Sequence, residues 1–144
     1  KCRVSYEDSW MEERTYGGKR GHEGTDLMPP TNQRGFYPVF SATAGTVEHM
    51  GWLQKGGWRI GIRSEQGGYF YYAHLSEYAP RMEEGKTVEA GEMLGYMGDS
   101  GYGEEGTVGQ FAVHLHFGIY IQTADGREVS VDPYWILKGL EGEP

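Results

Sequence analysis

Glycine is the residue that most constrains this chain, because 24 of its 144 residues are glycine, against about 7% in an average protein. The glycines form no repeat and separate short runs of apolar, aromatic and β-branched residues. Glycine in this arrangement marks the turns and bulges between strands. The sequence therefore predicts an all-β fold, an antiparallel β-sandwich or half-barrel, followed by a short C-terminal helix over residues 133–138 that begins at a proline.

Length and charge exclude several classes of protein. A chain of 144 residues is expected to form one domain and to bury about two-thirds of its unfolded surface. The net charge of −8 without a basic stripe argues against nucleic acid as a partner. No apolar run approaches the roughly 20 residues of a membrane-spanning helix. Cys2 is the only cysteine, so the chain has no internal disulfide. We expect a monomer, with any export signal upstream of Lys1.

One apolar run, residues 111–121, carries two histidines. It contains β-branched and aromatic residues and no proline, which predicts a strand. Alternate side chains of a strand point to opposite faces, so His114 and His116 share one face and Leu115 lies on the other. Two neutral imidazoles on one face can bind a metal ion such as zinc. Two core histidines that are satisfied by hydrogen bonds would explain the pattern equally well.

A second candidate metal pair consists of His22 and Asp26, with Gly24 between them. Two donors of one zinc ion lie about 3–4 Å apart, whereas four extended residues span about 13 Å. The backbone must therefore bend between the two residues, and Gly24 has the conformational freedom to do so. The glycines before this segment and the two prolines after it leave no room for a helix. The pair also fits a simple structural hydrogen bond within a turn.

The rest of the chain is predicted as short strands joined by tight turns: 38–43, 46–50, 58–63, 69–75, two strands in 83–98 that pair with each other, and 128–131 after a turn at residues 125–126. His74 lies at the end of one of these strands, a common place for active-site groups, although a structural histidine also fits there. The glycine-rich segments 51–57 and 99–109 are predicted as surface loops. Three aromatic residues in or beside these loops, Trp52, Trp58 and Tyr102, are candidate walls of a groove, although ordinary loop aromatics would explain them equally well.

Five short motifs occur in order along the chain: His22-x-Gly-x-Asp26, Tyr72-Ala-His74-Leu, Val88-x-Ala-Gly91 with Leu94-Gly and Gly98, His114-Leu-His116-Phe, and Val131-Asp-Pro133. In this order and spacing the chain resembles the lysostaphin-like zinc metalloendopeptidases, which cleave peptide bonds in bacterial peptidoglycan. The resemblance runs from about Gly17 to Leu137. It implies a β fold related to the lipoyl/biotinyl hybrid sandwich and an extracytoplasmic location, secreted or associated with the cell envelope.

Carried over by position, the resemblance implies one zinc ion per chain, held by His22, Asp26 and His116 with a fourth position for water. It implies that His114 is the general base and that His74 orients the water or stabilises the oxyanion. The zinc metallopeptidase domain would cover residues 17–144, after an N-terminal arm of residues 1–16. One departure from the family pattern is the stretch between residues 29 and 39, which is a few residues longer than usual. It borders the metal loop, so the departure concerns the shape of the substrate groove and not the chemistry.

Two other functions are compatible with parts of the sequence. The first is a catalytically silent metal-binding scaffold that activates another wall hydrolase, against which the presence of His74 and His114 counts. The second is a lipoyl-like carrier with Lys86 as its acceptor, but the residues around Lys86 lack the pattern of such carriers. For an endopeptidase, both glycine bridges and D-alanyl–diamino-acid cross-links stay open as the bond that is cleaved.

Overall fold

The computed structural model describes residues 5–6, 13–14, 20–21 and 24–133. Within them, no helix is long and apolar enough to cross a membrane. The strands are, in chain order, β1 (Ser5–Tyr6), β2 (Glu13–Arg14), β3 (Arg20–Gly21), β4 (Thr25–Met28), β5 (Pro38–Phe40), β6 (Gly45–Leu53), β7 (Gly57–Ser64), β8 (Tyr69–Tyr78), β9 (Thr87–Val88), β10 (Met93–Met97), β11 (Leu115–Gln122) and β12 (Glu128–Val131).

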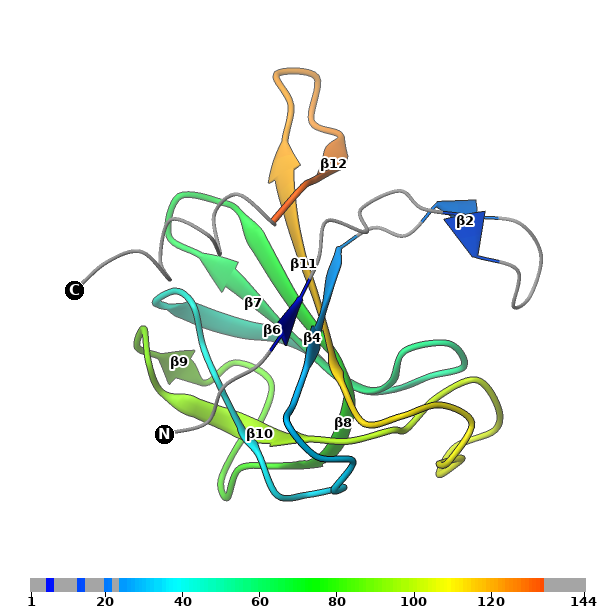
Figure 1. Ribbon diagram of the computed structural model, residues 1–144. Helices are drawn as coiled ribbons and strands as arrows, with labels where there is room; N and C mark the ends of the chain where they lie inside the picture. Colours follow the sequence, from blue (N-terminus) through cyan, green and yellow to red (C-terminus); the bar gives the residue numbers. More distant parts are fainter. Residues whose placement is uncertain (1–4, 7–12, 15–19, 22–23, 134–144) are drawn as a thin grey trace.

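Ten of the strands in the described residues form one antiparallel sheet, and β2 pairs with β3 in a separate ribbon. The path across the large sheet is β1–β4–β11–β8–β7–β6–β9. β12 extends β11 as a hairpin, and β10 pairs with both β5 and β8. In Figure 1, β10 runs across the lower part of the view while β4 and β11 run upward, so the sheet is strongly bent. The predicted all-β, antiparallel fold is confirmed.

Strand β8 changes its partner part-way along its length. Its first half pairs with β11, ending where Ala73 is opposite His116. Its second half pairs with β10, beginning where Leu75 is opposite Met97. His74 falls between the two pairings. The fold therefore brings the end of β10, the beginning of β11 and an irregular point of β8 together.

The hydrophobic core lies on the face of the sheet opposite to His116. Along β11, Leu115, Phe117 and Ile119 alternate with His116 and are buried, as a strand with one face in the core requires. The other strands add fully buried side chains to the same core: Val47, Ile60, Ile62, Tyr72, Leu75, Val88 and Leu94. The hydroxyl of Tyr72 accepts a hydrogen bond from the amide of Ala42 at 2.9 Å, so this buried polar group is satisfied.

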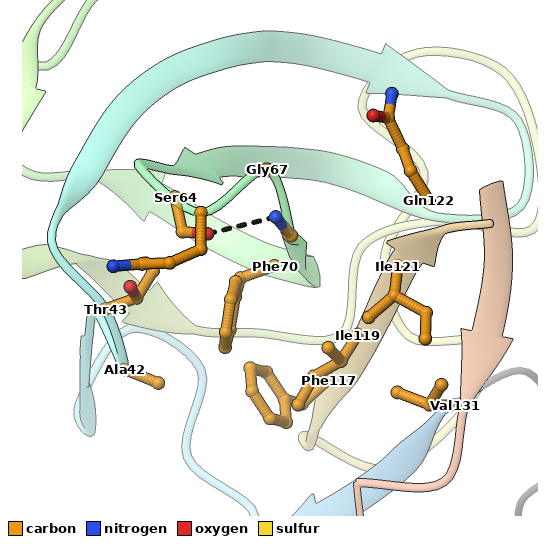
Figure 2. A pocket seen from close by; sticks show the side chains of 12 residues that line it. Ala42, Thr43, Ser64, Gly67, Phe70, Phe117, Ile119, Ile121, Gln122 and Val131 are labelled. Atoms are coloured by element: carbon orange, nitrogen blue, oxygen red, sulfur yellow. Dashed lines mark hydrogen bonds between the residues drawn. The ribbon is translucent and has the colours of Figure 1, made fainter. Parts of the chain in front are cut away.

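A cavity of about 550 Å³ opens on this apolar side of β11. Figure 2 shows aromatic and aliphatic side chains lining it, with a hydrogen bond between Ser64 and Gly68 at its rim. Its apolar lining consists of Phe70, Phe117, Ile119, Ile121 and Val131. Because these residues of β11 alternate with the histidine face, the cavity is separate from the candidate site.

Residues 51–57 are not the predicted surface loop. β6 continues to Leu53 and β7 begins at Gly57, so only residues 54–56 lie outside the two strands. Trp52 and Trp58 are opposite each other in this hairpin, with ring centroids 5.2 Å apart in an edge-to-face arrangement. Such aromatic cross-strand pairs stabilise a hairpin, which explains why the strands extend further than the glycines suggested.

Two further strand predictions are corrected. β11 begins at Leu115 and not at residue 111, because the amide of Val113 donates to the Asn32 side chain at 2.8 Å and not to a neighbouring strand. In residues 83–98, β9 pairs with β6 and β10 pairs with β5 and β8, so the two strands do not pair with each other.

At the two ends of the chain, little of the prediction falls on described residues. The predicted helix lies outside them except for Pro133. Within the predicted arm 1–16, β1 pairs with β4, and the domain boundary stays a prediction. The turn at residues 125–126 is confirmed, because Gly126 has a φ of +84° in the hairpin that leads to β12.

Candidate functional site

Asp26 and His116 meet across two neighbouring strands. They are directly opposite in the register of β4 and β11, so their side chains lie on the same face. The Nδ1 atom of His116 is 3.1 Å from Oδ1 of Asp26. This separation suits a hydrogen bond, and it is also within the roughly 3–4 Å expected of two donors on one tetrahedral zinc ion.

The backbone before Asp26 passes very close to the His116 ring at Gly24. Gly24 has a φ of +141°, and a Cβ atom there would lie 2.5 Å from the carbonyl oxygen of Phe117 and 3.0 Å from Nε2 of His116. Only glycine fits this approach without displacing the strand. The predicted bend between His22 and Asp26 therefore passes beside the His116 ring, while His22 itself lies outside the described residues.

His114 approaches the same carboxylate from the loop that precedes β11. It forms an isolated bridge with Gly98, and its Nδ1 atom is 2.9 Å from the carbonyl oxygen of Ala112. A carbonyl only accepts, so Nδ1 carries the proton and Nε2 of the neutral ring keeps its lone pair. That Nε2 atom is 3.7 Å from Oδ1 of Asp26. His114 and His116 thus converge as their spacing predicts, although only His116 lies in β11.

His74 occupies a bulge in β8. Between the pairs Trp58–Leu75 and Ile60–Tyr72, β8 has one residue more than β7. His74 has a φ of +65°, a conformation uncommon for a residue other than glycine and typical of functional sites. The predicted position at a strand end is therefore corrected to an irregular point within β8.

The His74 ring faces the other two histidines. Its centroid is 4.8 Å from that of His114 and 6.1 Å from that of His116. Its Nδ1 donates to the carbonyl oxygen of Ser100 at 2.7 Å, which leaves the lone pair on Nε2. Burial lowers the pKa of His74 to about 3, and the two neighbouring histidines act in the same direction. His74 is therefore neutral at pH 7.

Ser100 is a residue that the sequence did not single out. It is fully buried, its hydroxyl donates to the carbonyl of Leu75 at 2.7 Å, and it accepts from the amide of Trp58 at 3.1 Å. A Cβ atom at Gly57 would lie 2.4 Å from its carbonyl group, so the loop and β7 are in close contact. No local pattern marks Ser100, because these partners lie more than 20 residues away.

Replacing Ser100 with alanine is expected to lower the free energy of unfolding by about 1–3 kcal/mol, because the buried polar groups of Trp58 and Leu75 lose their partner. The carbonyl that holds Nδ1 of His74 should also become mobile. Denaturant unfolding measures the first effect, and ¹⁵N chemical shifts of His74 measure its tautomer. Ser41→Ala is the matched control, since it removes a buried hydroxyl elsewhere. A destabilised variant with an unchanged His74 tautomer would contradict the positioning role.

The long segment between residues 29 and 39 forms hydrogen bonds with the loop that carries His114 and with the loop that carries Ser100, the partner of His74. Asn32 accepts the hydrogen bond from Val113, next to His114. Arg34 forms two hydrogen bonds with Asp99, next to Ser100, at 2.6 and 3.0 Å. This segment therefore lies beside the site, as predicted from its place in the sequence.

Aromatic side chains cover one side of His74. The rings of Phe111 and Tyr102 lie 4.6 and 5.9 Å from the His74 ring and 5.0 Å from each other. The indole nitrogen of Trp52 donates to the carbonyl of Gly103 at 3.2 Å, which ties the β6–β7 hairpin to the loop of Tyr102. Of the three aromatic residues proposed as groove walls, Trp58 instead packs against the core.

The described residues supply only part of the ligand set that a metal ion needs. Among the described residues, no group of three or more His, Cys, Asp or Glu side chains is placed to hold a metal ion. Asp26 and His116 supply two suitable donors, one carboxylate and one imidazole, at a suitable separation. The third donor inferred from the sequence is His22, two residues before the glycine that contacts His116.

Comparison with known proteins identifies the family. The chain matches peptidase family M23 over residues 20–133 and belongs to that family. It is 45% identical over 138 residues to the L-Ala–D-Glu endopeptidase of Bacillus subtilis (strain 168), covering 95% of this chain and 40% of the relative. The family inferred from the five motifs is thus confirmed.

Two solved structures share the fold. A Ruminococcus gnavus protein, provisionally described as the glycyl-glycine endopeptidase lytM, is 61% identical with a TM-score of 0.87, over 96% of this chain and 55% of that one. The catalytic domain of lysostaphin from Staphylococcus simulans is 27% identical with a TM-score of 0.67, over 95% of this chain and 92% of that one. The chain spans 40% of the Bacillus relative's length and 55% of the Ruminococcus chain.

Proposed function

We propose that this chain is a zinc-dependent endopeptidase that hydrolyses peptide bonds in bacterial peptidoglycan, with residues 17–144 as the peptidase unit. The observation that carries the proposal is the convergence of His74, His114 and His116 around Asp26 in a member of peptidase family M23. Three imidazoles and a carboxylate on one face form a site for metal-assisted hydrolysis.

One zinc ion per chain would be held by His22, Asp26 and His116. When bound, zinc polarises the scissile carbonyl and lowers the pKa of a water molecule towards about 7. A set of three protein ligands is typical of catalytic zinc, whereas structural zinc usually has four. The proximity of His116 to Asp26, and of Gly24 to His116, supports this ligand set.

His114 is proposed as the general base. Its Nε2 lone pair points toward the carboxylate of Asp26, where the reacting water would be bound, and Nδ1 is fixed by the Ala112 carbonyl. In this tautomer the ring can accept a proton from the attacking water at Nε2 and later give it to the leaving amine.

His74 is proposed to orient the water. Because Nδ1 donates to Ser100, the free Nε2 atom of the neutral ring accepts a hydrogen bond and cannot donate one. Stabilising an oxyanion would require a proton on Nε2, and burial of the ring opposes the charged form. Of the two roles that the resemblance implied for His74, the geometry therefore supports orientation of water.

The substrate and location are proposed from the relatives. The Bacillus relative is named for an L-Ala–D-Glu bond, and the Ruminococcus protein for a glycyl-glycine bond. Both kinds of bond, and the D-alanyl–diamino-acid cross-link, are candidates for this chain. A peptidoglycan peptide as substrate would place the protein outside the cytoplasm, where it is expected to act as a monomer.

Metal analysis and defined muropeptides test this function. After reconstitution at neutral pH, the protein should contain one zinc ion per chain, and it should cleave one of three muropeptide sets that carry L-Ala–D-Glu, glycine-bridge or D-alanyl–diamino-acid bonds. Mass spectrometry of the products identifies the bond. A protein that binds no zinc would contradict the proposal. A protein that binds zinc but cleaves none of the three muropeptide sets would also contradict it and would indicate a catalytically silent scaffold.

A further inference from the structure

Asp99 is the one acidic residue that is buried in the described part of the chain, with 6% of its surface exposed. Burying a carboxylate costs free energy unless a cation or several hydrogen-bond donors replace the lost water. Arg34 provides this replacement, because its Nε and Nη2 atoms donate to the two carboxylate oxygens at 2.6 and 3.0 Å. A bidentate pair of this kind fixes direction as well as distance. The pair therefore joins the segment 29–39 to a defined point after β10.

The two residues next to Asp99 hold the histidines that are proposed to act in catalysis. The carbonyl of Gly98, just before it, accepts a hydrogen bond from the amide of His114 at 3.1 Å. The carbonyl of Ser100, just after it, accepts from Nδ1 of His74 at 2.7 Å. Both acceptors are backbone groups, so their positions depend on the path of the chain through this three-residue segment. The Asp99 side chain is attached at its centre.

The backbone around Asp99 also packs closely against His74. A Cβ atom at Gly98 would lie 2.9 Å from the carbonyl oxygen of His74, and one at Gly101 would lie 3.1 Å from its Nδ1 atom. Because the chain approaches His74 this closely on both sides of Asp99, it cannot shift without changing the surroundings of the ring. A displacement of residue 99 would therefore reach the hydrogen bond that fixes the tautomer of His74.

Arg34 projects from a part of the chain that is itself anchored beside this segment. The amide of Gly35 donates to the carbonyl of Met97 at 3.0 Å, and the amide of Met97 donates to the carbonyl of Tyr37 at 2.8 Å. The Asp99 carboxylate has no hydrogen-bond partner other than Arg34 among the described residues. The guanidinium is therefore a fixed point, and the carboxylate depends on it alone.

We propose that Arg34 and Asp99 are a pair of positioning residues, which hold the chain at residues 98–100 so that its carbonyls keep His74 and His114 in their reactive arrangement. The inference rests on the proposed endopeptidase function and adds two residues to it. Both side chains act through the backbone and not on the substrate. A misplacement of reacting groups by about 1 Å can cost about 100-fold in rate, so this ion pair can have a large effect on turnover.

Replacing Arg34 with glutamine tests the proposal, because it leaves the buried Asp99 carboxylate without its cation. On the muropeptide that is cleaved, we expect kcat to fall about ten- to a hundredfold, while KM and the zinc content stay unchanged. The ¹⁵N chemical shifts of His74 should change as well, since the Ser100 carbonyl no longer holds Nδ1 in one position. Arg34→Lys should keep part of the activity, because it retains the charge and loses the bidentate geometry.

A double variant shows whether the two residues act together. Arg34→Gln combined with Asp99→Asn removes the cation and the buried charge at once, so no uncompensated carboxylate remains. We expect this double variant to have a higher kcat than Arg34→Gln alone, with ¹⁵N shifts of His74 closer to those of the unmodified protein. Residues that act independently would instead lower kcat by the product of their separate effects.

Arg127→Gln is the matched control. It removes the same charge from another arginine–aspartate pair, in which Nε of Arg127 is 2.9 Å from Oδ2 of Asp125. That pair lies in the β11–β12 hairpin, and its two side chains are 74% and 59% exposed. Solvent can therefore take the place of the arginine, so kcat, KM and the ¹⁵N shifts of His74 should all stay unchanged.

An unchanged kcat with unchanged His74 shifts in a folded Arg34→Gln protein would overturn the positioning role. The same holds if denaturant unfolding shows lower stability while the folded variant keeps its full kcat, because the pair would then be structural only. If Arg34→Gln does not fold, Arg34→Lys and Asp99→Asn carry the same comparison. Failure of the proposed function has a different signature: the unmodified protein would cleave no muropeptide, while the His74 shifts would still respond to Arg34→Gln.

Discussion

Replacing His114 with alanine is expected to lower the rate of peptide hydrolysis by about 10²–10⁴, the usual contribution of a general base, while zinc stays bound. The reason is that the lone pair on Nε2 of His114 faces Asp26 and is available to accept a proton. The contact between Asp26 and His116, the two proposed zinc ligands, does not involve His114. Steady-state kinetics on the cleaved muropeptide gives the rate, and the zinc content of the same preparation shows that the metal site is intact.

His74→Ala should behave in the same way, with zinc retained and activity lost, because its Nε2 atom acts on water. His49→Ala is the matched control, since His49 is an exposed histidine of β6 whose Nε2 atom lies 3.5 Å from Oε2 of Glu48. Near-ultraviolet circular dichroism checks that each variant is folded. Full activity in His114→Ala would remove this residue from the mechanism.

The convergence of His114 and His116 could be predicted from strand alternation, although His114 lies just before β11 and is also positioned by its bridge with Gly98. Their meeting with Asp26 could not be predicted from local pattern, since Asp26 and His116 are 90 residues apart and depend on the register of β4 and β11. The family motifs placed Asp26 in the set, and the register gives the physical reason for its position.

The position of His74 shows where the pattern of strand residues is insufficient. The run from Tyr69 to Leu75 reads as a regular strand that ends near a loop, but β8 continues to Tyr78 with a bulge at His74. The bulge is held by distant backbone contacts, including the hydrogen bond from the His74 amide to the carbonyl of Gly56 at 2.7 Å. Such contacts exist only in the folded chain.

Ser100 was missed for a related reason. Ser100 lies in a polar, glycine-rich segment that is typical of exposed loops, although its side chain is fully buried against β7 and β8.

His116→Ala and Asp26→Ala are each expected to lose zinc and activity together, as is His22→Ala, because each change removes a proposed ligand. Loss of a residue that merely supports a ligand typically lowers metal affinity by about 10–100-fold, so loss of a ligand itself should exceed about 100-fold. Competition with a chelator measures the affinity, and elemental analysis measures the zinc content. In all three cases the purified variant should remain folded with its core unchanged.

The pair His114 and His116 provides the decisive comparison, because both rings approach the same carboxylate oxygen, at 3.7 and 3.1 Å. We expect His116→Ala to lose zinc and His114→Ala to keep it. Zinc affinity of the unmodified protein should also fall in acid, since protons compete with the metal for the nitrogens of His22 and His116. If His114→Ala lost the metal and His116→Ala retained it, the roles of ligand and base within the pair would be reversed.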